Sequence, residues 1–373
     1  MKNKLLIIAI FTLAFSACFN EQGNEASIII NLSGSTGNRA VWPHDEYTTL
    51  RDKIVYKVKI DGPDQIEIEP TDEKIIERTV TPGRYTITVE ALCLDILYAK
   101  DSIKKEIKAG PNRISIKLKD LKKTYLIAEG IIREFSTLAE ALLEGRDILL
   151  SEEFTVSIYN DEHLIDPDHG GKIVSGKIVT IENRGSGTAT IRHPDPDPDL
   201  DYPGGSIFSV SGNLTLQGDI TLKGIDNNGA ALIAVEIGGI FNMGREGMDD
   251  NVVITGNENT AEGGGVSVSY DGTFNMYSEK ITGNTAENGG GVYVYGLYEG
   301  LGVGTFNMHG GTITGNTADK GGGVYVTADG TFRMKGGKIT GNTADEGGGV
   351  YVEDGGVYDN DGGTIDDGVY EES

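Results

Sequence analysis

The strongest constraint on the fold is a repeat of 26 residues in the C-terminal half of the chain. The segments KITGNTAENGGGVYV, TITGNTADKGGGVYV and KITGNTADEGGGVYV begin at residues 280, 312 and 338, and a looser copy covers residues 253–268. Each unit contains three short runs typical of strands, VYV, GTFNM and KITGNTA, separated by glycine-rich turns. Nothing within one unit can pair as a hairpin, so each strand is expected to pair with its own copy one turn later, about 4.8 Å away. The repeat therefore predicts a parallel β-helix.

Equivalent hydrophobic positions recur from unit to unit. They alternate with polar residues within each strand, so one face of each strand is expected to point into a dry core. Stacking places each side chain on its own copy, which predicts ladders of like residues. The longer intervals between units hold insertions at 244–250 and 295–304. The predicted ladders are those of Val266, Val292, Val324 and Val350, and of Phe241, Phe274, Phe306 and Phe332.

The corners of the repeat carry glycine and asparagine. The glycines are expected to allow positive φ angles and to let neighbouring coils approach closely. An asparagine follows the KIT or TIT run of each unit, at Asn284, Asn316 and Asn342. Asparagine tolerates the left-handed conformation and bonds locally, and stacked amides bond to one another along the coil axis. We therefore predict a structural amide ladder at one corner.

The N-terminus has the pattern of an export signal. Lys2 and Lys4 precede an apolar run that is too short to span a bilayer. The following Ser-Ala-Cys resembles a bacterial lipobox, in which cleavage before the cysteine leaves that cysteine acylated. The resemblance implies a signal peptide over 1–17, lipidation at Cys18, a tether over 18–26 and a lipid-anchored protein of the bacterial cell envelope, at the outer membrane or cell surface. The alternative is an ordinary secretory signal that is cut nearby.

Two further regions separate the tether from the repeats. Residues 27–121 contain short runs of period two with turns between them, which predicts an antiparallel β-sandwich of Ig-like size. A helix is predicted near 136–144, with Thr137 and Glu140 as a capping box and Gly145 as its end. This helix is expected to cap the first coil of a β-helix over 122–373.

Cys93 lies in an apolar run and is expected to be a buried, inert thiol. The predicted fold class is thus all-β, a β-sandwich followed by a helix-capped β-helix.

Charge and motifs narrow the range of partners. The chain has 57 acidic and 32 basic residues and a net charge of −25, with no basic patch, so nucleic acid is not expected to bind. No zinc-type spacing of His or Cys occurs. The segment HPDPDPDL makes calcium the one candidate cofactor, although an extended strip does not converge on an ion and a solvated acidic loop is the alternative. The four carboxylates of that segment are Asp195, Asp197, Asp199 and Asp201.

A strip of tyrosines is the predicted ligand-binding feature. Tyr293, Tyr325 and Tyr351 alternate with inward valines and are expected to stack on the outer face of one sheet. Such a strip can form a platform for sugar rings or for a partner protein. Alternatively, the rings only shield the sheet and stack on each other.

Glycoside hydrolysis needs paired carboxylates in a cleft. The outward acids of the repeat lie on turns beside glycines, where solvated acids are expected, and the motifs of polygalacturonases are absent. We therefore expect no catalytic residues and no enzymatic activity. These outward acids are Asp271, Glu287, Asp319, Asp329 and Asp345.

The repeat GTFNMxGGxITGNTAxxGGGVYV resembles bacterial right-handed parallel β-helix surface proteins, of the kind found as spirochaete lipoproteins and, more remotely, chlamydial polymorphic outer-membrane proteins. The resemblance covers residues 207–366. It implies a surface-exposed lipoprotein that acts as a structural or adhesive scaffold, anchored in the membrane by lipid and contacting a host, cell or glycan surface. The alternative is a carbohydrate-active β-helix enzyme or a glycan-binding module.

Overall fold

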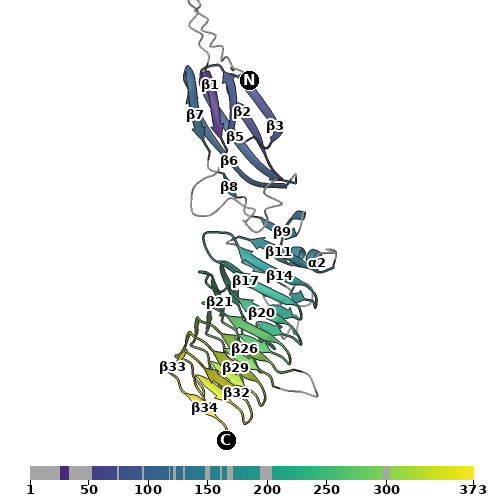
Figure 1. The fold of residues 1–373 in the computed structure, drawn as a ribbon, viewed down its shortest axis with the longest axis vertical. Helices are drawn as coiled ribbons and strands as arrows, with labels where there is room; N and C mark the ends of the chain where they lie inside the picture. Colours follow the sequence, from purple (N-terminus) through teal and green to yellow (C-terminus); the bar gives the residue numbers. More distant parts are fainter. Residues whose placement is uncertain are drawn as a thin grey trace, which may run out of the picture. The chain divides into compact units, whose positions relative to one another are not determined.

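The computed structural model describes residues 26–32, 53–73, 75–94, 96–116, 118–120, 123–128, 131–147, 152–159, 162–165, 171–193, 204–296 and 302–373. The chain divides into two compact units (Figure 1). The first holds most of strands β1–β8, and the second holds β9–β34 with the one helix of the described residues. The predicted fold class is confirmed: a β-sandwich precedes a helix-capped parallel β-solenoid.

The first unit is built from two sheets. In the smaller sheet β1 lies between β4 and β7, and the larger sheet has the order β3-β2-β5-β6-β8. β1 pairs antiparallel with β4 but parallel with β7, so the smaller sheet is mixed, where the period-two pattern predicted only antiparallel pairs. The strands are β1 (Ala26–Asn31), β2 (Ile54–Asp61), β3 (Gln65–Thr71), β4 (Ile75–Val80), β5 (Gly83–Cys93), β6 (Ile96–Ile107), β7 (Gly110–Ser115) and β8 (Lys119–Asp120).

A tyrosine fixes one end of the sandwich. The buried Tyr85 hydroxyl lies 2.7 Å from Asp64 Oδ2 and 2.8 Å from the Thr81 carbonyl oxygen, and Thr81 N donates to Asp64 Oδ2 at 2.5 Å. Burial raises the pKa of Tyr85 to about 12, and the Tyr85 hydrogen bond lowers the pKa of Asp64. The network joins the turn before β3 to the turn before β5.

Replacing Tyr85 with phenylalanine is expected to lower the free energy of unfolding of the sandwich by about 1–2 kcal/mol, because Asp64 and Thr81 each lose a partner. Since Asp64 has a depressed pKa, its contribution is present at neutral pH and is lost as the pH falls through that pKa. The loss in Tyr85→Phe should therefore shrink in acid. Denaturation of the whole chain, followed by hydrogen exchange in β5, measures both effects; an unchanged midpoint at neutral pH would contradict the prediction.

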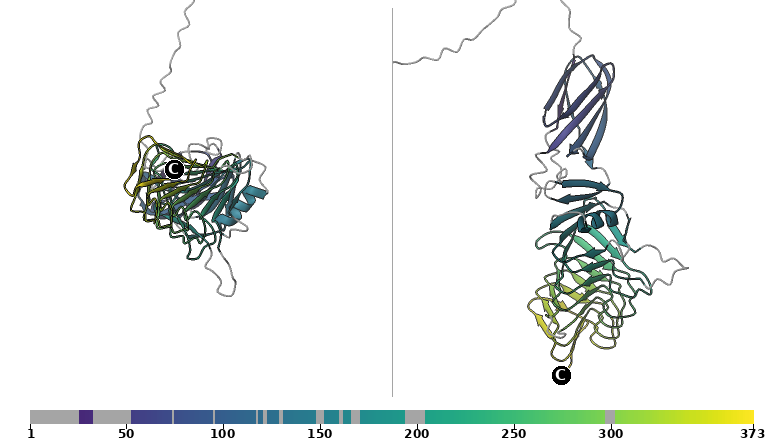
Figure 2. Two further views of the ribbon diagram at one scale, coloured as in Figure 1. Left: turned by 90° about the horizontal axis from the view of Figure 1, so that it is seen from below. Right: turned by 90° about the vertical axis from the view of Figure 1, so that its right-hand side faces the viewer.

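The second unit is a solenoid of three parallel sheets, each receiving one strand from every coil (Figure 2). About seven turns run from residue 153 to 365. Sheet 1 contains β11 (Glu153–Ile158), β14 (Ile178–Asn183), β17 (Asn213–Gln217), β20 (Ile240–Met243), β23 (Thr273–Met276), β26 (Thr305–Met308), β29 (Thr331–Met334) and β32 (Val357–Asn360).

The other two sheets follow the same order. Sheet 2 contains β12 (Glu162–Leu164), β15 (Ala189–Arg192), β18 (Asp219–Lys223), β21 (Asn251–Thr255), β24 (Lys280–Thr282), β27 (Thr312–Thr314), β30 (Lys338–Thr340) and β33 (Thr364–Ile365). Sheet 3 contains β13 (Lys172–Ile173), β16 (Phe208–Val210), β19 (Ile233–Val235), β22 (Val266–Val268), β25 (Val292–Val294), β28 (Val324–Val326), β31 (Val350–Val352) and β34 (Val369–Glu371).

The predicted ladders are confirmed residue by residue. Val266 pairs with Val292, and the same register carries through the valines of the next two coils. The rings of Phe241, Phe274, Phe306 and Phe332 stack at centroid distances of 5.2, 4.7 and 4.8 Å. All these side chains are fully buried in one continuous core. Identical letters in the sequence therefore mark neighbours in space.

Each position of the GGG corner requires glycine for a steric reason of its own. Gly289 has a φ of +65°, which favours glycine. A Cβ on Gly290 would lie 2.5 Å from the Thr317 carbonyl oxygen, and one on Gly291 would lie 2.5 Å from the Gly323 carbonyl oxygen. The backbones of successive coils thus meet at this corner without room for a side chain.

The first coil is covered by a hairpin and a helix. β9 (Thr124–Ala128) pairs antiparallel with β10 (Ile131–Phe135) and with β11, so it closes the first edge of sheet 1. Helix α2 (Leu138–Asp147) lies beside this coil, at the opposite end of the solenoid from β34 (Figure 1). Leu138, Ala141 and Leu142 enter the solenoid core, as a capping helix requires.

The start of the helix follows the sequence pattern and its end does not. Glu140 N donates to Thr137 Oγ1 at 3.1 Å, the expected N-cap bond. Gly145 was predicted to end the helix, but α2 continues to Asp147, so that prediction is wrong. Gly145 is present because a Cβ there would lie 2.4 Å from the Phe154 ring on β11. It allows close packing of the helix on the coil.

Candidate functional site

Some of the predicted functional residues lie outside the described residues, namely Cys18 and the acidic set Asp195, Asp197, Asp199 and Asp201. The lipidation and calcium predictions stay predictions. Cys93 is buried, as expected, and burial raises the pKa of its thiol to about 11. Within the ranges given above, no three His, Cys, Asp or Glu side chains gather in a way that could hold a metal ion.

The predicted amide ladder exists and is fully buried. Asn284 Nδ2 donates to Asn316 Oδ1 at 3.1 Å, and Asn316 Nδ2 donates to Asn342 Oδ1 at 3.0 Å. The same oxygens accept the backbone N–H groups of Asn284 and Asn316, at 3.0 and 3.1 Å. Each side chain also donates to a carbonyl oxygen of the preceding coil, such as that of Ile281 at 3.1 Å. These residues hold the corner together.

The tyrosine strip stacks as predicted, but its ring faces are not exposed. Tyr293, Tyr325, Tyr351 and Tyr370 form a column with centroid distances of 5.1, 4.9 and 4.9 Å and interplanar angles of 12° or less. The first three side chains are only 8, 6 and 0% exposed. The column thus matches the second of the two alternatives, in which the rings shield the sheet and stack on each other, because each ring covers the next.

Charged side chains seal the flanks of this column. The Tyr325 hydroxyl donates to Glu353 Oε1 at 2.5 Å, and the Tyr351 hydroxyl donates to Glu372. Lys320 Nζ lies 2.8 Å from the Tyr351 hydroxyl and 4.6 Å from its ring centroid. Burial, the Glu353 hydrogen bond and nearby charges raise the pKa of Tyr325, so it remains a neutral donor.

The column changes abruptly at its start. On the outer face of sheet 3 the register runs through Ser209, Ala234 and Ser267 before it reaches Tyr293. Three coils thus carry small, partly exposed side chains where the next four carry rings. The change from serine to tyrosine between adjacent strands makes a step in side-chain height on this face.

Two partly exposed rings stand at this step. Tyr295 contacts Tyr293 edge-on, with centroids 4.6 Å apart and an interplanar angle of 64°, and Tyr270 lies 5.5 Å from Tyr295 at 55°. Tyr295 is held by Tyr293, which is itself locked in the stack. Sequence analysis did not predict a role for Tyr270 or Tyr295, because neither tyrosine recurs in the repeat.

Two carboxylates complete the step. Glu236 follows β19 and accepts a hydrogen bond from the Ser209 hydroxyl at 3.0 Å. Glu262 lies at the corner before β22, where its backbone forms an isolated β-bridge with the backbone of Asn288 in the next coil. Burial, followed by the charges of Glu262 and Glu236 and by Tyr270, raises the pKa of Tyr295 to about 12. We call this group, Glu236, Ala234, Glu262, Ser267, Tyr270 and Tyr295, the tyrosine step.

Sheet 1 carries a second amide ladder that the sequence analysis did not predict. Asn275 Nδ2 donates to Asn242 Oδ1 at 2.9 Å, and Asn307 Nδ2 donates to Asn275 Oδ1 at 3.0 Å. These side chains lie on the outer face, partly exposed. The asparagine that recurs in the TFNM strands could have predicted this ladder. Beyond them Tyr277 stacks on His309, with centroids 4.9 Å apart.

Glu279 is a buried acid that breaks the repeat, since Gly311 and Gly337 occupy the equivalent positions. It is 2% exposed and accepts hydrogen bonds from Tyr277 N at 2.9 Å and from the Ser278 hydroxyl at 3.1 Å. Burial outweighs these bonds and raises the pKa of the carboxyl group.

This raised pKa predicts a pH effect on stability. A raised folded-state pKa means that the contribution of Glu279 is fully present below the unfolded pKa, about 4.3, and is lost as the pH rises through the folded value. Glu279→Gln removes this titration, so its stability relative to the wild type should rise between acid and neutral pH. Urea midpoints measured across that range test this, and a constant difference would contradict it.

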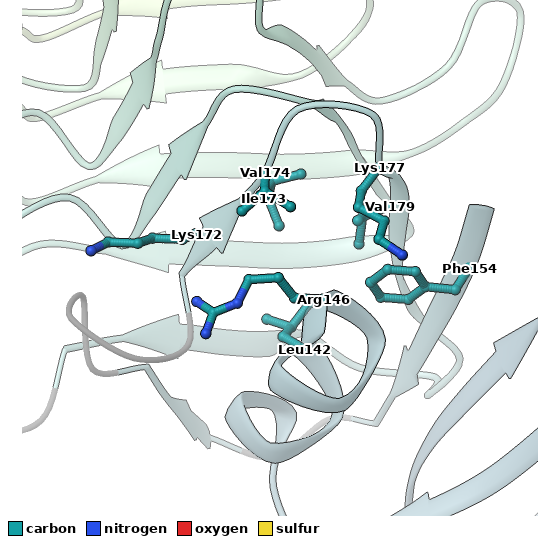
Figure 3. Close-up of a pocket in the computed structure, with 8 residues that line it drawn as sticks. All are labelled: Leu142, Arg146, Phe154, Lys172, Ile173, Val174, Lys177 and Val179. Atoms are coloured by element: carbon teal, nitrogen blue, oxygen red, sulfur yellow. The ribbon is translucent and has the colours of Figure 1, made fainter. Parts of the chain in front are cut away.

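A small hollow lies where α2 meets the first coil (Figure 3). It leaves no enclosed space large enough for a water molecule, whereas typical ligand pockets hold roughly 300–1,000 Å³. Figure 3 shows Arg146 and Leu142 of α2 facing the strand residues around Ile173. The hollow is a packing gap of the cap. Its other lining residues are Phe154, Lys172, Val174, Lys177 and Val179.

Comparisons with known proteins add no name to this geometry. No protein-family model, curated protein or solved structure matches the chain. In the part of the chain that the structure describes, no helix is long and apolar enough to cross a membrane.

Proposed function

We propose that this chain is a lipid-anchored bacterial surface protein that acts as a structural and adhesive scaffold. One observation carries the adhesive part of the proposal: the outer face of sheet 3 changes from small side chains to tyrosines between Ser267 and Tyr293. A rigid stack of coils supports this step. Residues that depart from a regular framework, as those of the step do, are where function is expected.

The anchor is proposed from the lipobox at Cys18. Two or more acyl chains hold a protein stably on a membrane, whereas one chain does so only marginally. In the sequence, the tether and the sandwich would then lie between the anchored cysteine and the solenoid. The proposed location is the cell envelope, at the outer membrane or cell surface.

Expression of the full precursor in a bacterium that processes lipoproteins tests this proposal. Wild-type protein should fractionate with membranes, be cleaved by protease added to intact cells, and increase adhesion of those cells to host cells or matrix. Cys18→Ser should leave the protein folded but release it from the membrane fraction and abolish the added adhesion. Wild-type protein that is protected from protease, or that adds no adhesion, would refute the proposal.

A second candidate is a carbohydrate-active enzyme. The observation that favours it is that two carboxylic acids, Glu236 after β19 and Glu262 before β22, lie on adjacent coils of sheet 3, because glycosidases use two carboxylates. Incubation of the protein with polysaccharides, followed by measurement of new reducing ends, tests it. Glu236→Gln and Glu262→Gln should each remove such activity, while binding without any new reducing ends favours the scaffold.

A further inference from the structure

We infer that the tyrosine step binds a neutral, pyranose-based glycan. This inference rests on the proposed function, since it names the partner of the adhesive scaffold. It concerns the start of the tyrosine column, where the column changes from Ser267 to Tyr293, and not the column itself, whose ring faces are covered.

The first argument is one of room. In four successive coils a tyrosine ring fills the outer-face position of sheet 3, and the coil spacing of about 4.8 Å suits one ring for each coil. At Ala234 and Ser267 the same position carries a small side chain that is partly exposed. Tyr293 is covered and Tyr295 packs against it, so a flat six-membered ring would lie over these small side chains beside Tyr295.

The second argument is the presence of fixed aromatic rings. The faces of an aromatic ring are electron-rich, so they attract the C–H groups on the apolar face of a pyranose ring. Tyr270 and Tyr295 are partly exposed at the step. Tyr295 is fixed against Tyr293 at 4.6 Å, so little conformational entropy is lost when a ligand packs on it.

The third argument is the chemistry of the polar groups. The carboxylates of Glu236 and Glu262 can accept hydrogen bonds but cannot donate them, and sugar hydroxyl groups can donate. Glu236 already accepts a hydrogen bond from the Ser209 hydroxyl, so its carboxylate suits hydroxyl partners in this position. Hydrogen bonds to a charged acceptor are stronger than neutral ones.

Charge selects the class of glycan. Two carboxylates at the step and a net charge of −25 on the chain oppose the carboxylates or sulfates of acidic polysaccharides. A basic peptide would satisfy the charges, but it would not use the small neutral surface at Ala234 and Ser267, where a sugar ring can lie. The step therefore fits a neutral glycan better than an acidic glycan or a basic protein.

The test is binding of the whole mature chain to an array of neutral, sialylated, uronate-containing and sulfated glycans, with polylysine as a competitor. We expect binding to neutral glycans alone. Tyr295→Ala should weaken it at least tenfold, and Glu236→Gln and Glu262→Gln several-fold. Ser267→Tyr should abolish it, because the new ring extends the column into the space that the sugar would take.

Controls separate binding from folding. Tyr277→Ala, which removes a partly exposed tyrosine from sheet 1, should bind as the wild type does. Ser267→Tyr should keep or raise the melting temperature, and if it does not fold, Tyr295→Ala with the two Gln variants decides the question. Retention of acidic glycans alone, displacement by polylysine, undiminished binding by Ser267→Tyr, or no binding by the wild type overturns the inference. Cell adhesion that persists in Ser267→Tyr would refute this site while leaving the scaffold function in place.

Discussion

Replacing Asn316 with alanine is expected to lower the free energy of unfolding of the solenoid by about 3–5 kcal/mol, one of the two largest effects of a single substitution that we predict. The side chain is 0% exposed and makes four hydrogen bonds within the corner ladder. Alanine leaves the buried backbone N–H of Asn284 without its acceptor and the Ile281 carbonyl oxygen without this donor. Because the corner is buried, we do not expect water to restore these hydrogen bonds at no cost.

The matched control is Asn307→Ala on the outer face of sheet 1. Asn307 also donates to an asparagine of the neighbouring coil, at 3.0 Å, but it is partly exposed, so water can replace the lost bond. Its loss is expected to stay below about 1 kcal/mol. Urea denaturation of the whole chain compares the two variants. Equal losses in both would show that burial of the corner ladder does not set its strength.

Replacing Gly322 with alanine is expected to cost about 3 kcal/mol or more, at the upper end of overpacking effects. The new Cβ would lie 2.5 Å from the Thr343 carbonyl oxygen and 2.7 Å from the Gly348 carbonyl oxygen. Both atoms belong to the backbone of the next coil, so relief requires the coils to separate. Since each coil of a solenoid is stabilised mainly by its neighbours, the damage should extend to the coils that follow.

Gly315→Ala serves as the control for this second prediction. Gly315 has a φ of +66°, but an added Cβ would meet only Thr282 Oγ1 at 3.6 Å and Gly283 N at 3.9 Å, both at ordinary contact distances. Only backbone strain of about 1–2 kcal/mol is then expected. Hydrogen exchange in β28 and β31 should rise strongly in Gly322→Ala and little in Gly315→Ala. Protection of both strands in Gly322→Ala would mean that the coils have more room than the structure indicates.

These two predictions explain why the chain repeats its letters. The asparagine and the glycines touch their own copies one coil away, and a change in one copy leaves a partner in the next coil unsatisfied or displaced. The residues of the tyrosine step lie outside this mutual dependence. They can vary without breaking the stack, which makes them suitable for recognition.

Periodicity was sufficient for the architecture. The recurrence of Val292, Phe274 and Asn284 predicted strands, register, core ladders and the amide corner, because in a solenoid a repeat distance in sequence becomes an adjacency in space. The helix start was also readable, because Thr137 caps it through a contact three residues away. The end of the helix could not be predicted, because the glycine at position 145 is needed for close packing against Phe154 on β11 and does not end the helix.

Surface exposure was decided only by the tertiary structure. The pattern placed Tyr293, Tyr325 and Tyr351 on the outer face, but an alternating strand does not tell how far a ring is covered by the rings above and below it or by Lys320 and Glu353. The tyrosine step likewise exists only because unrelated residues from several coils meet on one face. Sequence repetition determined which residues stack, and the packing of non-repeating side chains decided which of them remain accessible.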